Sequence, residues 1–185
     1  MSRRLIAVCS GALVLTACGG SSSAARPTPA VLLSRVGGGY HLADASGPLS
    51  KDSLAAATAV PRAAMASYLG RARLRSAGER VWTSANDGFV TDIVATFATS
   101  DEARGLVTLA AKTLSGPASQ PFSPPGVPGA QAFVQTSDVA GKTMFCVFAF
   151  APSGAQAFVV TRCTPYPQDT VTLSRLLTEQ LARVG

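Results

Sequence analysis

Two cysteines near the C-terminus, Cys146 and Cys163, constrain the fold of this chain more than any other pair of residues. They lie in two apolar segments that are joined by a Pro-Ser-Gly-Ala turn at 152–155. A two-residue turn centred after Gly154 places the cysteines directly opposite each other, as a non-hydrogen-bonded pair, which is the closer of the two kinds of pair in an antiparallel ladder. The sequence therefore predicts a hairpin in which the two sulfur atoms can meet.

That hairpin belongs to a predicted three-stranded meander in the C-terminal third of the chain. Strand-like segments run over 131–136, 143–151 and 156–164, and Ala140-Gly141-Lys142 supplies the first turn between them. A final helix follows, which Asp169 or Thr170 can cap. Its apolar residues recur at three- and four-residue intervals and form one stripe: Leu173, Leu176, Leu177, Leu181 and Val184. We expect this stripe to pack on the sheet.

A second hairpin is predicted earlier in the chain, over 79–84 and 89–97. Its turn is Asn86-Asp87-Gly88, because these residue types tolerate a positive φ. Three apolar residues of the second arm share one parity and favour that face as the core side: Phe89, Ile93 and Phe97. Trp82, the only tryptophan, lies on the first arm, and we expect it to pack in a core rather than stack on a ligand.

Helices are predicted between and before these strands. Ser50 or Asp52 can cap a short helix at 54–57, and Pro61 fits the first position of a helix that runs to about Leu69. These two helices follow a short strand predicted at 40–44.

The clearest local signal is a capping box at Thr99 and Glu102, in which each side chain bonds the backbone amide of the other residue. Helical spacing of apolar residues continues to Leu114, and Gly116-Pro117 ends the helix. In order, the elements predict an α+β fold: an antiparallel sheet of about five to six strands covered by helices, with a C-terminal β-meander followed by a terminal helix.

The first 17 residues have the layout of a secretory signal. Ser2-Arg3-Arg4 is basic, residues 5–15 are mostly apolar, and Thr16-Ala17 provides small residues before a cleavage site. This apolar run of about eleven residues is too short for a bilayer-spanning helix, which needs about 20 residues. The arginine pair leaves both general export and the twin-arginine route open.

The stretch Leu15-Thr16-Ala17-Cys18 resembles the bacterial lipobox. The resemblance implies a diacylglyceryl group on the Cys18 thiol, cleavage just before Cys18 and, often, acylation of the new amino terminus. Two or three acyl chains anchor a protein stably, whereas a single chain is marginal. An ordinary signal peptide with a cysteine near the cut is the alternative. The expected location is the outer face of the cytoplasmic membrane, in the cell envelope.

The predicted organisation has three parts. Residues 1–17 are the removed signal peptide, residues 18–39 are the lipidated cysteine and a flexible Gly-, Ser- and Pro-rich tether, and residues 40–185 are a single α+β domain. Loss of Arg3 and Arg4 with the signal lowers the formal charge from +6 to +4. No basic block is dense enough to indicate nucleic acid as a partner.

This location also bears on the two cysteines of the C-terminal hairpin. Cys9 is removed with the signal and Cys18 takes lipid, so Cys146 and Cys163 remain as an even pair in an oxidising compartment. We therefore expect a structural disulfide. A redox-active dithiol is the alternative, although the spacing Cys-x-x-Cys is absent.

The most basic stretch of the chain contains four arginines: Arg71, Arg73, Arg75 and Arg80. The alternation over 71–75 has the period of a strand, which would point its three guanidinium groups to one face. A solvated sheet edge is one interpretation. Contact with an anionic surface, either phospholipid headgroups or an acidic partner, is the other.

Candidate catalytic residues are few. His41 is the sole histidine, and we expect a surface or capping role for it. We find no Ser-His-Asp set with a nucleophile elbow and no cluster with metal-ligand spacing in the sequence. The prediction is therefore no metal and no cofactor beyond the lipid on Cys18. An envelope enzyme remains the competing class, which polar side chains converging around His41 or Asp92 would favour.

Beyond the lipobox, much of the chain resembles small actinobacterial, mycobacterial-type cell-envelope lipoproteins of uncharacterised type. The segments concerned are 40–44, 79–83, 128–130 and the hairpin of Cys146 and Cys163. The resemblance implies no known activity.

We predict a lipid-anchored extracytoplasmic binding or scaffold module. Its ligand is either an apolar envelope molecule held between sheet and helix or a protein partner met by the proline-rich loop 115–130. A lipid-sized cavity would favour the apolar molecule, whereas a full core with an exposed apolar loop would favour the protein partner.

Overall fold

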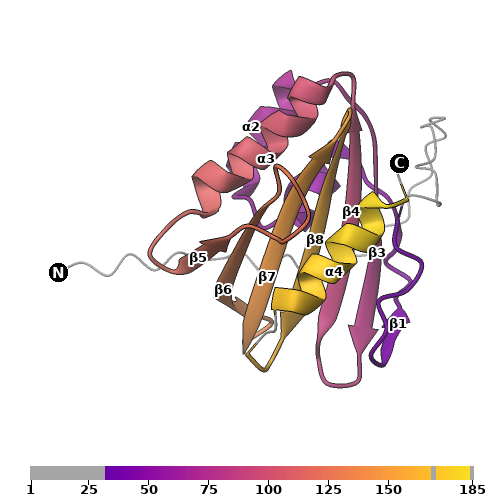
Figure 1. Cartoon of the computed structure of the whole chain (residues 1–185), viewed down its shortest axis with the longest axis vertical. Coiled ribbons are helices and arrows are strands. Elements are labelled where there is room, and N and C mark those ends of the chain that lie inside the picture. Colours follow the sequence, from indigo (N-terminus) through magenta and orange to yellow (C-terminus); the bar gives the residue numbers. More distant parts are fainter. Residues whose placement is uncertain (1–31, 168–169, 184–185) are drawn as a thin grey trace.

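One antiparallel sheet forms the centre of the structure, a computed structural model that describes residues 32–167 and 170–183 (Figure 1). Within these residues the sheet has eight strands, and four helices pack around it. The strand order is β1-β3-β4-β8-β7-β6-β5, and β2 pairs with β3 beside β1. The strands are β1 (Tyr40–Leu42), β2 (Gly47–Pro48), β3 (Leu74–Ser84), β4 (Phe89–Phe97), β5 (Ser119–Phe122), β6 (Gln131–Val139), β7 (Lys142–Ser153) and β8 (Gln156–Thr164). The helices are α1 (Lys51–Ala57), α2 (Arg62–Arg71), α3 (Ser100–Leu114) and α4 (Thr170–Leu181).

The predicted fold type is confirmed, but the strand count of five to six is too low. The strands that the sequence does not reveal are β2 and β5, which are short and contain Pro48 and Pro121. Each pairs with a single neighbour, β3 or β6 respectively. Proline cannot donate to a ladder and is tolerated at such edges, so both segments read as turns in the sequence and become strands only through their partners.

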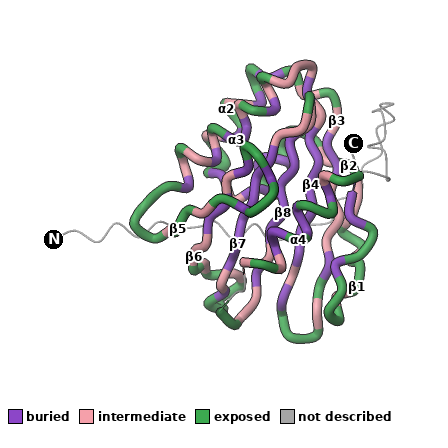
Figure 2. The backbone as a smooth tube through the Cα atoms, viewed as in Figure 1, coloured by how far each residue is buried: buried purple, intermediate pink, exposed green. Residues whose placement is uncertain are grey.

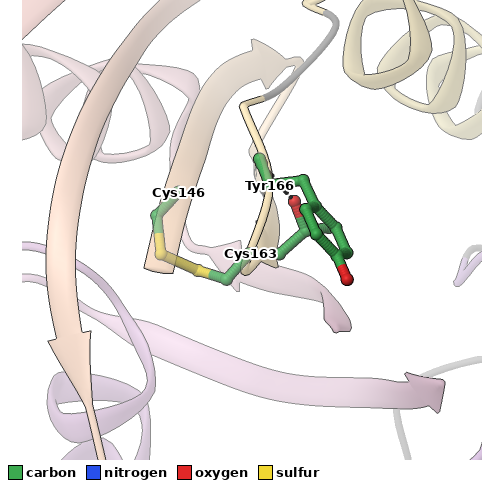
Figure 3. Close-up of a disulfide and its surroundings, with 4 residues drawn as sticks. Cys146, Cys163 and Tyr166 are labelled. Carbon is green, nitrogen blue, oxygen red and sulfur yellow. Dashed lines mark hydrogen bonds between the residues drawn. A yellow bond between two sulfur atoms is a disulfide. The ribbon is translucent and has the colours of Figure 1, made fainter. Parts of the chain in front are cut away.

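The hairpin of β7 and β8 has the predicted register. Ser153 lies opposite Gln156, and Cys146 lies opposite Cys163 with a Cα–Cα distance of 4.1 Å. The two sulfur atoms are bonded, and both cysteines are buried (Figure 3). The predicted disulfide is therefore present in the structure, where it ties together the two strands at the centre of the sheet.

The hairpin of β3 and β4 is confirmed, but its second arm is buried on both faces. The turn places Asp87 at φ 60°. Phe89, Ile93 and Phe97 pack on the predicted core side, while Val90 and Val94 are buried on the opposite face. This happens because the sheet carries a separate apolar core on each side. Figure 2 shows the resulting run of buried residues along the central strands.

Helices α1, α2 and α3 line the first core. The capping box of α3 is present, since Thr99 Oγ1 accepts from the Glu102 amide and Glu102 accepts from the Thr99 amide. Glu102 also accepts from the Arg73 amide at 3.1 Å and from its guanidinium at 3.0 Å. These two bonds are the main reason that the pKa of Glu102 is lowered to about 2. The start of α3 is thereby fastened to the chain that enters β3.

Helix α4 packs on the second core, across β7 and β8 (Figure 1). Leu173, Leu176 and Leu177 are fully buried there, as the apolar stripe predicts, and Trp82 packs in the same core. Two residues of the prediction, the capping candidate Asp169 and the stripe residue Val184, lie outside the described residues.

The segment 32–36 completes the second core, which corrects the predicted boundary of the tether at residue 39. Leu32, Leu33 and Val36 are buried with Trp82 and the α4 leucines. Three glycines follow, all at positive φ (72°, 61° and 77°), and turn the chain into β1. Apolar residues beside a glycine run resemble a linker in the sequence, but here they cover sheet surface. The folded domain therefore includes Leu32.

The proline-rich loop 115–130 is partly ordered into the sheet. Its first half contains β5, and Val127 and Ala130 near its end are buried in the second core. The loop therefore crosses over the second face, where Pro124, Val127 and Ala130 are buried, while most of its other residues are exposed.

The disulfide should carry a measurable part of the stability. Replacing both cysteines, Cys146→Ala and Cys163→Ala, should lower the free energy of unfolding by roughly 3 kcal/mol, because the bond closes a loop of 17 residues that is otherwise free in the unfolded chain. Denaturant unfolding of the oxidised protein and the double variant measures this difference. Equal midpoints, or two free thiols found by mass spectrometry of the exported protein, would contradict the assignment.

Candidate functional site

The predicted lipidation site, Cys18, lies outside the described residues, as does the whole of the predicted signal peptide. None of the helices in the described part of the chain is long and apolar enough to cross a bilayer. Within the described residues, Leu32 already belongs to the second core.

The predicted arginine row is not formed. Arg71 ends α2 and bonds the Ser67 hydroxyl, while Arg73 is engaged with Glu102. The strand begins only at Leu74, and the register shifts between Leu74 and Ser76, which leaves Arg75 in an irregular position. A helix end and a bulge interrupt the alternation, so these guanidinium groups do not share a strand face.

Arg80 lies on the opposite side of the sheet from the first core. Its side chain shares a face with Trp82, and its guanidinium donates to the carbonyl oxygens of Leu32 and Leu33 at 3.2 and 2.6 Å. Arg80 therefore holds the segment that leads into the domain, a role that could not be predicted from the sequence.

A buried polar cluster surrounds Asp92, the residue opposite Arg80 in the β3–β4 ladder. The Asp92 carboxylate is fully buried and accepts from the Leu33 amide at 2.6 Å and from the side-chain amide of Gln180 in α4. Arg183, just beyond α4, also lies close enough to act on it electrostatically. One carboxyl group thus joins the start of the domain, the sheet and the C-terminal helix.

Burial raises the pKa of Asp92 to about 7. The amide of Leu33, the amide of Gln180 and the charges of Arg80 and Arg183 act in the opposite direction. Gln180 Oε1 is buried, and no donor among the described residues lies within hydrogen-bonding distance of it. The Asp92 carboxyl group can therefore take up a proton near neutral pH. The contact that it makes between β4, the segment 32–36 and α4 is thus sensitive to pH.

The residues that could have supported an active site are not brought together. His41 is exposed in β1, where it pairs with Thr83, while Asp92 is buried beneath α4 and the segment 32–36. In residues 32–167 and 170–183, no three His, Cys, Asp or Glu side chains gather as a metal site would require.

The candidate binding surface is a hollow between the proline-rich loop and the first turns of α4. It has a volume of about 360 Å³. Phe122, Pro125 and Val171 provide its apolar lining, and Val171 is 71% exposed. Its polar lining consists of Ser123, Thr170, Ser174, Arg175 and Thr178. Arg175 is paired with Glu179, and Ser174 and Thr178 bond carbonyl groups of α4, so these side chains border the hollow without converging on its centre.

The sequence indicated only one side of this hollow. The loop 115–130 was a candidate recognition surface, whereas Val171 lies at the start of the last helix, on the side away from its buried stripe. An exposed valine in the first turn of an otherwise amphipathic helix was the available signal.

The fold is thus of the α+β class, with an antiparallel sheet buried on both faces and a terminal helix after the C-terminal strands. No family model matches the chain, and no curated protein is similar to it in sequence. In structure it is similar to the extracellular domain of PknH from Mycobacterium tuberculosis, with a TM-score of 0.48 and 15% sequence identity over 78% of this chain and 84% of that chain.

The Asp92 cluster predicts an unusual dependence of stability on pH. Because the folded-state pKa of about 7 lies above the ordinary value of about 3.9, the folded chain binds the extra proton, and the free energy of unfolding should fall by up to about 1.4 kcal/mol per pH unit from about pH 4 to pH 7. In the variant Asp92→Asn, which keeps an acceptor for the Leu33 amide, most of this decline should disappear, and the remainder should come from Glu79, whose pKa is also raised by burial. Thermal or urea unfolding at several pH values measures it.

Glu102→Gln is the matched control. The pKa of Glu102 is about 2 in the folded chain, so its titration lies below about pH 5, and the variant should keep the wild-type slope at higher pH. The same slope in wild type and Asp92→Asn would show that Asp92 does not titrate in this range.

Proposed function

We propose that the protein is a lipid-anchored, extracytoplasmic binding module of the cell envelope. The observation that carries the proposal is the lipobox-like stretch ending at Cys18, after a signal-like leader. The compartment that it implies agrees with the disulfide of Cys146 and Cys163, a bond typical of exported proteins. Because the domain includes Leu32, the tether consists of residues 19–31. Thirteen residues span at most about 45 Å, which limits the distance from the anchor to the domain.

The partner that we propose is a protein, bound at the hollow between the proline-rich loop and α4. Both apolar cores consist of buried side chains from the sheet and its covering elements. The hollow, by contrast, opens at the surface and presents Phe122, Pro125 and Val171, side chains that suit contact with a protein surface. An apolar envelope molecule between sheet and helix would have to displace α4 residues that are fully buried.

An envelope enzyme is the competing class. Asp92, the carboxyl group that could have served as an acid or base, is committed to the Leu33 amide and to Gln180. Catalysis would require it to exchange these partners for a substrate.

The anchor is tested by Cys18→Ala. The variant should be released from the membrane fraction, because it lacks the acyl chains, and it should keep the unfolding midpoint of the wild-type domain. Fractionation of cells, with intact mass measurement of the wild-type protein, measures both. If the variant stays membrane-bound as firmly as wild type, or the mature protein carries no lipid mass, the anchor is wrong.

The binding surface is tested by photocrosslinking in the native envelope. A photoreactive residue at Val171, beside the hollow, should give a discrete protein adduct, whereas the same residue at Ala66, exposed on α2, should not. Gel shift and mass spectrometry identify the adduct. A lipid adduct at Val171 would favour the apolar ligand instead, and equal products at both positions would contradict a specific site.

A further inference from the structure

The point where the tether enters the domain carries two exposed arginines. In the segment 32–36, Ser34 and Arg35 are exposed between the buried residues Leu33 and Val36. Arg183, also exposed, donates from its guanidinium to Ser34 Oγ at 3.0 Å. Arg35 and Arg183 are 148 positions apart in the chain, yet this bond brings them to one surface patch, which we call the tether root.

Two other charged residues near the tether root are turned inward. Arg80 is directed at the carbonyl oxygens of Leu32 and Leu33, and Asp92 is fully buried under the same segment. Asp92 therefore cannot form a surface ion pair with Arg35 or Arg183. Glu179, one helical turn before Arg183, is paired with Arg175, so the two exposed side chains of the tether root, Arg35 and Arg183, are both basic.

The position of this patch is fixed relative to the tether. Arg35 lies three residues after Leu32, and Leu32 and Leu33 are held in the second core by packing and by three hydrogen bonds to Asp92 and Arg80. A chain pinned at Leu32 and anchored at Cys18 keeps the tether root closer to the bilayer, on average, than any surface on the far side of the sheet.

We infer that the tether root binds the anionic phospholipid headgroups of the membrane that carries the protein. This inference rests on the proposed lipid anchor. It replaces the predicted row at 71–75, where Arg73 is engaged with Glu102 and the three arginines share no face. Guanidinium groups suit phosphate because they donate in a planar fork, and attraction to an anionic leaflet acts within a Debye length of about 8 Å.

Vesicle binding by the unlipidated chain tests the inference. The mature chain with Cys18→Ala should bind vesicles that contain phosphatidylglycerol more tightly than vesicles of phosphatidylcholine alone, and the difference should shrink as salt is added. Adding Arg35→Gln and Arg183→Gln should weaken binding to the anionic vesicles by roughly 20-fold, since each basic residue near such a surface contributes about fivefold. Cosedimentation measures the affinities.

Two control variants separate charge from structure. Arg71→Gln with Arg75→Gln removes the same charge elsewhere and should leave binding within about twofold of the parent chain. Arg35→Lys with Arg183→Lys keeps the charge and should retain most of the binding. Arg26, in the tether, is unchanged in all of these variants, so its charge does not account for differences between them.

A larger loss of binding in the 35/183 variant than in the 71/75 variant would support the inference. No preference for anionic vesicles, or equal losses in the 35/183 and 71/75 variants, would overturn it, as would a loss explained by a lowered unfolding midpoint in the 35/183 variant. Because these chains carry no lipid, failure of the anchor would be seen separately, in the mass of the mature wild-type protein.

Discussion

The structure depends on how the second face of the sheet is closed. Helix α4 covers β7 and β8, and the segment 32–36 fills the space beside it, next to Trp82. Burying a carboxylate such as Asp92 is costly unless its oxygens are hydrogen-bonded. Here Leu33 and Gln180 donate the hydrogen bonds. The Asp92 carboxylate, which would destabilise an isolated strand, therefore connects both ends of the domain to β4. Without that fastening, part of an apolar sheet face would be open to water.

This closure also arranges the two candidate surfaces along α4. The hollow lies beside the first turns of the helix, around Val171, and the tether root lies just past its end, at Arg183. With a rise of 1.5 Å per residue, about 18 Å of helix separates these positions. If the tether root lies on the membrane as proposed, the hollow lies about one helix length away from it along α4.

The structure could be predicted from the sequence where it depends on residues that are close together in the chain. The register of Cys146 and Cys163, the capping box at Thr99 and the turn at Asp87 all follow from local spacing and residue type. The sequence was insufficient where the structure depends on a distant element. Residues 32–36 are buried because they pack on part of the second sheet face. The segment of β5 is a strand because it pairs with β6. Asp92 can link elements of the domain because its carboxylate accepts from Gln180, which is 88 positions away in the chain. The alternation at 71–75 was misleading because a helix end and a bulge interrupt it.

The expected free energies of membrane binding differ greatly between the proposed lipid and the tether root. Burial of acyl chains contributes about 0.8 kcal/mol per CH₂, so two or three chains supply far more affinity than two arginines at about 1 kcal/mol each. The two arginines would therefore add little to the membrane affinity of a lipidated protein. A lipid on Cys18 would not by itself set the orientation of the domain, however, and a preference of about 2 kcal/mol for one face is enough to populate one orientation more than tenfold over the others. Under the two proposals together, the lipid would hold the protein and Arg35 and Arg183 would orient it, with the hollow at the other end of α4.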